Sequence, residues 1–253
     1  MSFITSPGVI VPPLTAGGVA YGTGGQAKVN SAGTAGQFLK STGAGVPVWD
    51  AAGGFSQAQV FTSSGTFTVP SSGKFKVTIV GGGGGGSYSS SAESGGSGGG
   101  AGTVIKWYTG ATSGDTATVT IGTGGLASST AGIDGNAGGN STFVLSGFGT
   151  LTASGGAGGF SAPNGSTGGV GGNATGGDLN IKGQHAGKPT QNPSSFNFAV
   201  NTMAGSSLLG FGGTVFQQST IQSGTGYGGG GTGINSFGPP SGAGTNGVCI
   251  VEF

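Results

Sequence analysis

The chain has 253 residues, of which 65 are glycine, and its formal net charge is +1. Charged residues make up 5% of the chain, and all seven cations are lysines. The clustered positive charge with which proteins bind nucleic acid or an anionic membrane is therefore missing, and so is the high net charge typical of disorder. A single cysteine, Cys249, excludes an intramolecular disulfide framework and a multi-cysteine zinc site.

Residues 1–50 differ in composition from the rest of the chain. Residues 1–14 are extended, apolar and interrupted by prolines, without the basic start of a secretory signal peptide or the length of a transmembrane span. Residues 17–25 are expected to form a loop. Two short strands, at residues 37–40 and 46–49, are predicted around a glycine turn. Because such a pair is marginally stable alone, residues 1–50 are predicted to serve in attachment and oligomerisation.

The stretch 74–86 reads KFKVTIVGGGGGG, so a β-branched and aromatic strand pattern runs directly into six glycines. The same change from strand to glycine recurs further along the chain. A disordered linker would not repeatedly contain segments that need burial. No window has a helical period, so no long α-helix is predicted. Further strands are predicted at residues 59–62, 65–69, 74–80, 103–109, 116–121, 141–145, 150–153 and 247–253.

The glycine runs cannot pack by side chains, and ordering them costs backbone entropy. In the polyproline-II geometry, with three residues per turn, the N–H and C=O groups point outward and lack internal hydrogen bonds. Neighbouring glycine segments in a bundle would pair these groups. We therefore predict an all-β domain over residues 51–253, in which β-sandwich-like strands precede a polyglycine-II-type helix bundle with glycine-poor inserts at its ends. The predicted core side chains are Phe67, Phe75, Ile79, Val119, Val144 and Ile250.

Motifs for chemistry are weak in this chain. The pattern Gly81-x-Gly83-x-x-Gly86 follows a strand, as in a dinucleotide-binding fingerprint, yet the helix and the acidic residue that should follow are missing. His185, the single histidine, cannot form a multi-histidine metal site, and six scattered carboxylates offer no catalytic pair. We expect no catalytic residues, no metal and no cofactor, and therefore not an enzyme.

The glycine-poor inserts are better candidates for function. Residues 178–209 combine amides, lysines and aromatic rings, which suit the recognition of a sugar or a protein loop. In the alternative interpretation, Phe196 and Phe198 fold inward and cap the bundle. The candidate receptor-binding residues are Lys182, Gln184, His185, Lys188, Gln191, Asn192, Phe196, Asn197, Phe198 and Asn201, with Tyr88, Phe160, Phe216 and Tyr227 as weaker candidates for the same surface.

The order of the segments resembles a known family. GTFTVPSSGKFKVTIVGGGGGG (65–86), TVIKWYTGATSGDTATVTIGTGG (103–125) and GNSTFVLSGFGTLTASGGAGG (139–159) precede a glycine-rich region that closes on GVCIVEF. Over residues 59–253 this order is similar to the glycine-rich C-terminal domain of bacteriophage tail fibres and receptor-binding proteins. Residues 33–50 also resemble a short module of phage fibre proteins.

The resemblance implies a phage tail fibre or fibre-tip adhesin, located in the virion, that binds a bacterial outer-membrane protein or surface glycan through loops on the bundle. It further implies that residues 1–50 attach to other tail proteins and that the fibre is a homotrimer, with a monomeric tip left open. One alternative is a purely structural virion component without receptor contact. Another is a glycine-rich cell-surface or matrix protein, which the absence of a signal peptide disfavours.

Overall fold

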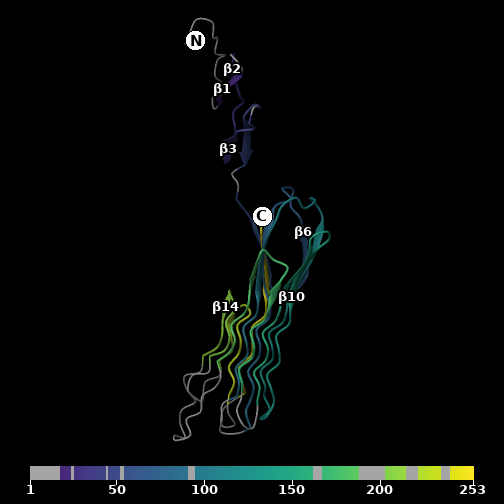
Figure 1. Cartoon of the computed structure of the whole chain (residues 1–253), viewed down its shortest axis with the longest axis vertical. Coiled ribbons are helices and arrows are strands. Elements are labelled where there is room, and N and C mark those ends of the chain that lie inside the picture. The colour runs from purple at the N-terminus through teal and green to yellow at the C-terminus, as the bar shows by residue number, and fades with distance from the viewer. Residues whose placement is uncertain are drawn as a thin grey trace. The chain divides into compact units, whose positions relative to one another are not determined.

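The computed structural model describes residues 18–23, 26–43, 45–51, 54–90, 95–161, 167–187, 203–214, 222–234 and 240–253. The chain divides into two units, residues 1–54 and 55–253, each with its own internal contacts. The boundary expected after residue 50 falls just inside the first unit. The two units are described separately below (Figure 1).

The first unit contains two antiparallel strand pairs. β1 (Ala20–Thr23) pairs with β2 (Gln26–Val29), and β3 (Gln37–Lys40) pairs with β4 (Val48–Ala51). The strand predicted at residues 37–40 is confirmed, whereas the loop predicted at 17–25 is wrong where β1 occupies it. Trp49 Nε1 donates a hydrogen bond to the carbonyl of Ser31 at 2.7 Å, which links β4 to the segment before β3.

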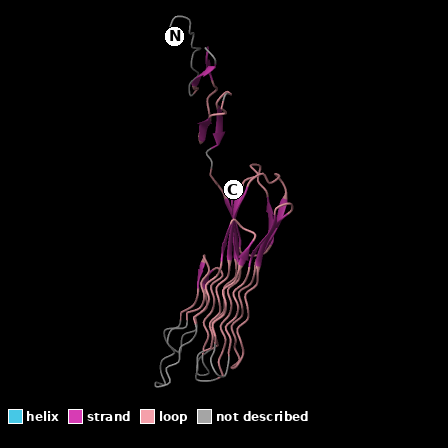
Figure 2. Ribbon diagram, in the orientation of Figure 1, coloured by secondary structure: helices cyan, strands magenta, loops and turns pink. Residues whose placement is uncertain are grey.

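The second unit starts from a sandwich of two five-stranded antiparallel sheets (Figure 2). One sheet has the order β12-β11-β10-β9-β6 and the other has the order β13-β8-β7-β16-β5. The described residues include no helix, so the all-β prediction is confirmed. The strands are β5 (Ala58–Phe61), β6 (Gly65–Thr68), β7 (Phe75–Val80), β8 (Thr103–Tyr108), β9 (Thr116–Thr120), β10 (Ser141–Leu145), β11 (Gly149–Ala153), β12 (Ala174–Thr175), β13 (Leu179–Ile181) and β16 (Val248–Glu252), with a separate pair of β14 (Gly210–Phe211) and β15 (Thr225–Gly226).

Aromatic side chains fill the space between the two sheets. Phe75 stacks on Tyr108 with ring centroids 4.6 Å apart, and both rings contact Phe143. The predicted core positions Phe67, Phe75, Ile79 and Val119 are buried. The prediction for Val144 is wrong: this side chain is 40% exposed, because it shares the outer face of its sheet with Thr118 and Thr150, which lie opposite it. Ile250 is only half-buried, on the outer face of the other sheet.

Beyond the sandwich, β7 continues into residues 81–89, which lie at the centre of a bundle of glycine-rich segments (Figure 1). From Gly81 to Tyr88, every third N–H group donates to the same neighbour, which is the threefold pattern of a polyproline-II helix. Three further segments donate to its carbonyls, so it has neighbours on all sides. Its N–H groups bind residues 96–102 (from Gly81, Gly84 and Ser87), 133–139 (from Gly82, Gly85 and Tyr88) and 242–245 (from Gly83 and Gly86), and its carbonyls bind residues 125–128, 156–159 and 231–234.

The close approach of these backbones explains the glycines. A Cβ atom on Gly84 would lie 2.0 Å from the carbonyl oxygen of Ala157, and one on Gly85 would lie 2.1 Å from that of Leu126. At the edge of the bundle, only some positions of each turn must be glycine. In residues 122–129, Thr123 and Leu126, three residues apart, are exposed, whereas Gly125 between them is buried.

Candidate functional site

The distal end of the bundle, the end away from the sandwich, gathers side chains other than glycine. At the polyproline-II rise, residues 81–88 extend roughly 25 Å from the end of β7. Tyr88 forms isolated bridges with Ile133 and Ile234, so these three residues lie at the same level. We use the name distal end for the described residues Tyr88, Ile133, Asp134, Phe160, Ser161, Met203 and Ile234.

The distal end presents apolar and aromatic surface with little charge. Ile133, Phe160 and Met203 are about half exposed, at 54%, 46% and 56%. A side chain that stays exposed on an ordered backbone offers contact area without the entropy loss of folding a loop. Aromatic and Met side chains are enriched at the centres of protein interfaces, so this composition suits an uncharged partner surface.

Hydrogen bonds fix the backbone beneath these side chains. The Ser161 N–H donates to Asp134 Oδ1 at 2.6 Å, and Ser161 Oγ donates to the Tyr88 carbonyl at 3.2 Å. That carbonyl also accepts the Gly132 N–H at 2.7 Å. Three separate segments of the chain are therefore held together at this end, which contains both half-buried Tyr88 and exposed Phe160, two of the predicted site residues.

The predicted residues Lys182, Gln184 and His185 have a different setting. They were expected in a loop insert that begins at residue 178, and this part of the prediction is wrong. Residues 182–187 form an edge segment of the bundle, in which the Gly183 N–H donates to Gly172 and the Ala186 N–H donates to Gly169. All three predicted side chains are exposed, but they follow the flank of the bundle. Gln184 Oε1 accepts the Ser206 N–H at 3.3 Å, so this side chain also has a structural contact.

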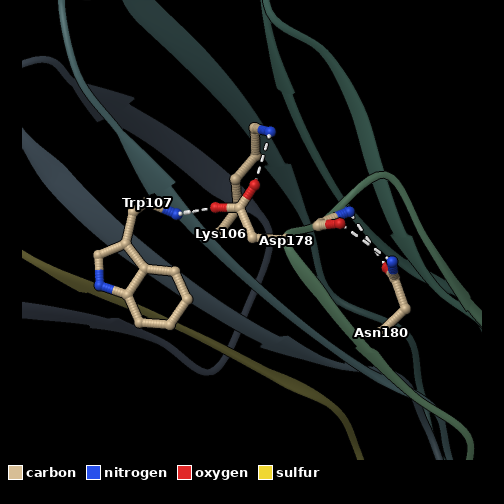
Figure 3. Close-up of polar contacts among 5 residues, drawn as sticks. Lys106, Trp107, Asp178 and Asn180 are labelled. Carbon is tan, nitrogen blue, oxygen red and sulfur yellow. Dashed lines mark hydrogen bonds and ion pairs between the residues drawn. The ribbon is translucent and has the colours of Figure 1, made fainter.

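The start of the same insert is fixed to the sandwich (Figure 3). Asp178 Oδ2 accepts the Trp107 N–H at 2.8 Å, and Oδ1 lies 3.5 Å from Lys106 Nζ. Asn180 closes the turn by exchanging two hydrogen bonds with Gly177. This corner directs the chain from β13 into the bundle, so that the insert proper begins after residue 187.

Tyr227 lies apart from the other candidates. Its ring packs against Val80, Ala101 and Val248, where the sandwich meets the bundle. The remaining candidates fall outside the described residues: Lys188, Gln191, Asn192, Phe196, Asn197, Phe198, Asn201 and Phe216.

Sequence reasoning did not select Ile133, Met203 or Ser161. A usable signal exists: each stands at the point where a glycine-rich segment meets a glycine-poor stretch, at the level of Tyr88 and Phe160 in the hydrogen-bond register. To recognise that these residues lie at one level, one must know which segments are neighbours in the bundle, and the amino-acid composition does not show this.

Groups with perturbed acidity belong to the sandwich core. Burial raises the pKa of the Cys249 thiol from 9.0 to about 12, and burial with the nearby Asp178 charge raises the pKa of Tyr108 well above its usual range. Both groups stay protonated at neutral pH and act as packing residues.

The described residues contain no group of three potential metal ligands. Among the described residues, no helix is long and apolar enough to cross a membrane.

Comparison with known families agrees with this architecture. The sequence model of the glycine-rich domain family matches residues 62–253. The chain belongs to the glycine-rich domain family. The match spans β6 to β16 and thus joins most of the sandwich and the whole glycine bundle in one domain. No curated protein matches the chain.

Proposed function

We propose that this glycine-rich domain protein is a bacteriophage tail fibre or fibre-tip adhesin that binds a bacterial surface receptor. The observation that carries the proposal is the distal end, where exposed Phe160, Ile133 and Met203 stand on a scaffold ordered by backbone hydrogen bonds. The family resemblance in the order of strands and glycine runs supports it. Residues 1–50 would then attach the protein to other tail proteins of the virion.

Recognition in this proposal is non-covalent. Rigid presentation lowers the entropy cost of binding, and several copies on one particle raise the avidity of a weak single contact. The low charge of the distal end favours a neutral receptor surface, such as a protein loop or an uncharged sugar. A purely structural tail component, with no receptor contact, is the second candidate, because the bundle by itself is a scaffold.

Labelled protein and a panel of bacterial strains test the proposal. On a strain that binds, Phe160→Ala should weaken binding by about tenfold or more, because an exposed aromatic anchor contributes on the order of 1–2 kcal/mol or more. Leu126→Ala is the matched control, since Leu126 is 69% exposed on the flank of the bundle. Equal binding by both variants would argue against the distal end as the receptor site. Absence of binding to any strain would favour the structural component.

Exchange of residues 188–202 for the matching segment of a related fibre provides a second readout. The exchanged segment leaves β13 and the edge segment 182–187 intact. A changed range of bound strains supports the adhesin, and an unchanged range with intact particles supports the structural component.

A further inference from the structure

The two outer faces of the sandwich differ in chemistry. On the sheet β12-β11-β10-β9-β6, the outward positions carry threonines that lie opposite one another from strand to strand. Threonine on an exposed strand face suits contact with water. One such row is Thr120, Thr142, Thr152 and Thr175, each exposed or half-buried.

The outer face of the sheet β13-β8-β7-β16-β5 is mostly apolar. Val60, Ile250, Thr78, Ile105 and Leu179 lie opposite one another in a single row that crosses all five strands. The ends of the row are open to solvent, with Val60 55% and Leu179 47% exposed. We call these five residues the cross-strand row.

Trp107 lies beside the cross-strand row and is 50% exposed. It stands on the same strand as Ile105, two positions further along, so both side chains emerge on the outer face. A half-exposed indole on a mostly apolar strand face is typical of an anchor residue in an interface.

The charges on this face are already paired. Lys76 Nζ lies 2.7 Å from Glu252 Oε2, on the neighbouring strand, and 5.9 Å from the centre of the Trp107 ring. Lys76 and Glu252 also lie opposite each other in the register. The face therefore carries no net charge from this pair, and it can lie against an identical face without charge repulsion.

The apolar surface continues towards the bundle. Tyr227 and Ile250 pack together against Val80 and Val248, and the Tyr227 N–H donates to the carbonyl of Leu209 at 3.0 Å. In that neighbouring turn, Leu208 and Phe211 are 50% and 77% exposed. Unpartnered apolar surface that extends in this way marks an interaction site more often than a solvent face.

We propose that the outer face of the sheet β13-β8-β7-β16-β5 binds the same face of a second copy of the chain. The cross-strand row is apolar at four of its five positions, with Thr78 only 7% exposed at its centre, so it can match itself about a two-fold axis, as an isologous interface requires. The self-neutralised pair Lys76–Glu252 favours an identical partner over one that is selected by charge. The threonine face of the other sheet stays in water. This pairing does not depend on receptor binding, and it differs from the homotrimer implied by the family resemblance.

Light scattering of the whole chain over a roughly hundredfold range of concentration tests the pairing. The expected mass rises from 23.6 kDa to twice that value. Val60→Lys and Leu179→Lys should each weaken pairing by about a hundredfold or more, because a lysine buried without a partner loses its hydration. Thr118→Lys and Thr150→Lys, on the threonine face, are the matched controls and should pair like the unmodified chain.

A constant mass of 23.6 kDa would overturn the proposal, and so would a lysine variant at Val60 or Leu179 that pairs normally. A mass three times the single chain would also overturn it, because a closed ring of three uses two different faces.

Thiol cross-linking of Val60→Cys, with Thr118→Cys as the control, gives a readout that does not depend on a destabilising lysine. Cys249 is fully buried and adds no background. Cross-linked dimers are expected from chains that carry Val60→Cys or Leu179→Cys, including a mixture of the two. None are expected from chains that carry Thr118→Cys. Cross-linking through Thr118→Cys alone would contradict the proposed face.

Discussion

At the scale of single residues, Gly84 has no room for a side chain. Its Cβ would lie 2.0 Å from the Ala157 carbonyl oxygen, a backbone atom that cannot move without shifting a neighbouring segment. We expect Gly84→Ala to lower the free energy of unfolding by about 3 kcal/mol or more. Denaturant unfolding measures this value.

Gly187→Ala is the control for Gly84. A Cβ on Gly187 would lie 3.7 Å from the Met203 carbonyl oxygen, an ordinary contact, at the edge of the same bundle. The expected change is within about 0.5 kcal/mol. Similar losses for both variants would mean that the central segment is less tightly packed than its hydrogen bonds indicate.

Cys249 makes the stability depend on pH. Its pKa is 9.0 in the ordinary state and about 12 when buried, so above pH 9 the unfolded chain loses a proton that the folded chain keeps. The stabilisation is complete below pH 9 and falls as the pH rises, by up to about 1.4 kcal/mol per pH unit from this group. Cys249→Ala should flatten this slope, whatever its effect on the stability at neutral pH. An unchanged slope above pH 9 would assign it to Tyr108 or to other groups.

At the scale of the element, buried serines complete the hydrogen bonding of the glycine segments. Ser241 is 3% exposed; its Oγ donates to the Gly86 carbonyl at 2.6 Å and accepts the Ser128 N–H at 2.7 Å. Ser241→Ala should lower the free energy of unfolding by about 1–3 kcal/mol, because buried groups lose a partner. Ser129→Ala, at an exposed position next to Ser128, should change it by less than about 0.5 kcal/mol. Calorimetry of the two variants separates the effects, and equal midpoints would refute this role of Ser241.

The elements also show what the sequence could predict. β7 and β16 were predictable because each is a run of mostly apolar residues, most of which are buried. The hairpin of β1 and β2 was missed because Gly22, Gly24 and Gly25 indicate a loop. Val144 was assigned to the core because hydrophobicity does not reveal which face of a strand is buried; the register does.

The edge segment 182–187 was missed for a related reason. Gly183 and Ala186, three positions apart, donate to residues 169–172, whereas Gln184 and Gly187 donate to residues 203–206. The side chains of Lys182, Gln184 and His185 remain exposed, so these positions can be polar. The fraction of glycine thus indicates how deep a segment lies in the bundle. Every residue is glycine in the central stretch 81–86, whereas about one position in three must be small at the edge. A search for small residues at every third position would have placed Lys182, Gln184 and His185 on the flank. The neighbours of Tyr88 at the distal end, in contrast, follow only from the three-dimensional pairing of the segments.

At the scale of the whole molecule, the second unit contains its own core of aromatic side chains between two sheets. We expect a chain that begins at Phe55 to keep the unfolding midpoint of this unit, within a few degrees. Trp107 reports on this unit and Trp49 on the first, so fluorescence of variants that keep one tryptophan follows each unit separately. A large loss of stability in the shortened chain would show that the second unit depends on residues 1–54.

The threefold arrangement of hydrogen bonds around residues 81–89 has a mechanical consequence. In a β-sheet the interstrand bonds lie in one plane, so a sheet flexes readily out of that plane. In this bundle the N–H groups of the central segment point to three neighbours and its carbonyls to three others, so bending towards any side must strain some of these bonds. The bundle should therefore act as a rod of nearly equal stiffness in every direction, and a pull at the distal end would pass along continuous chain into the strands of the sandwich.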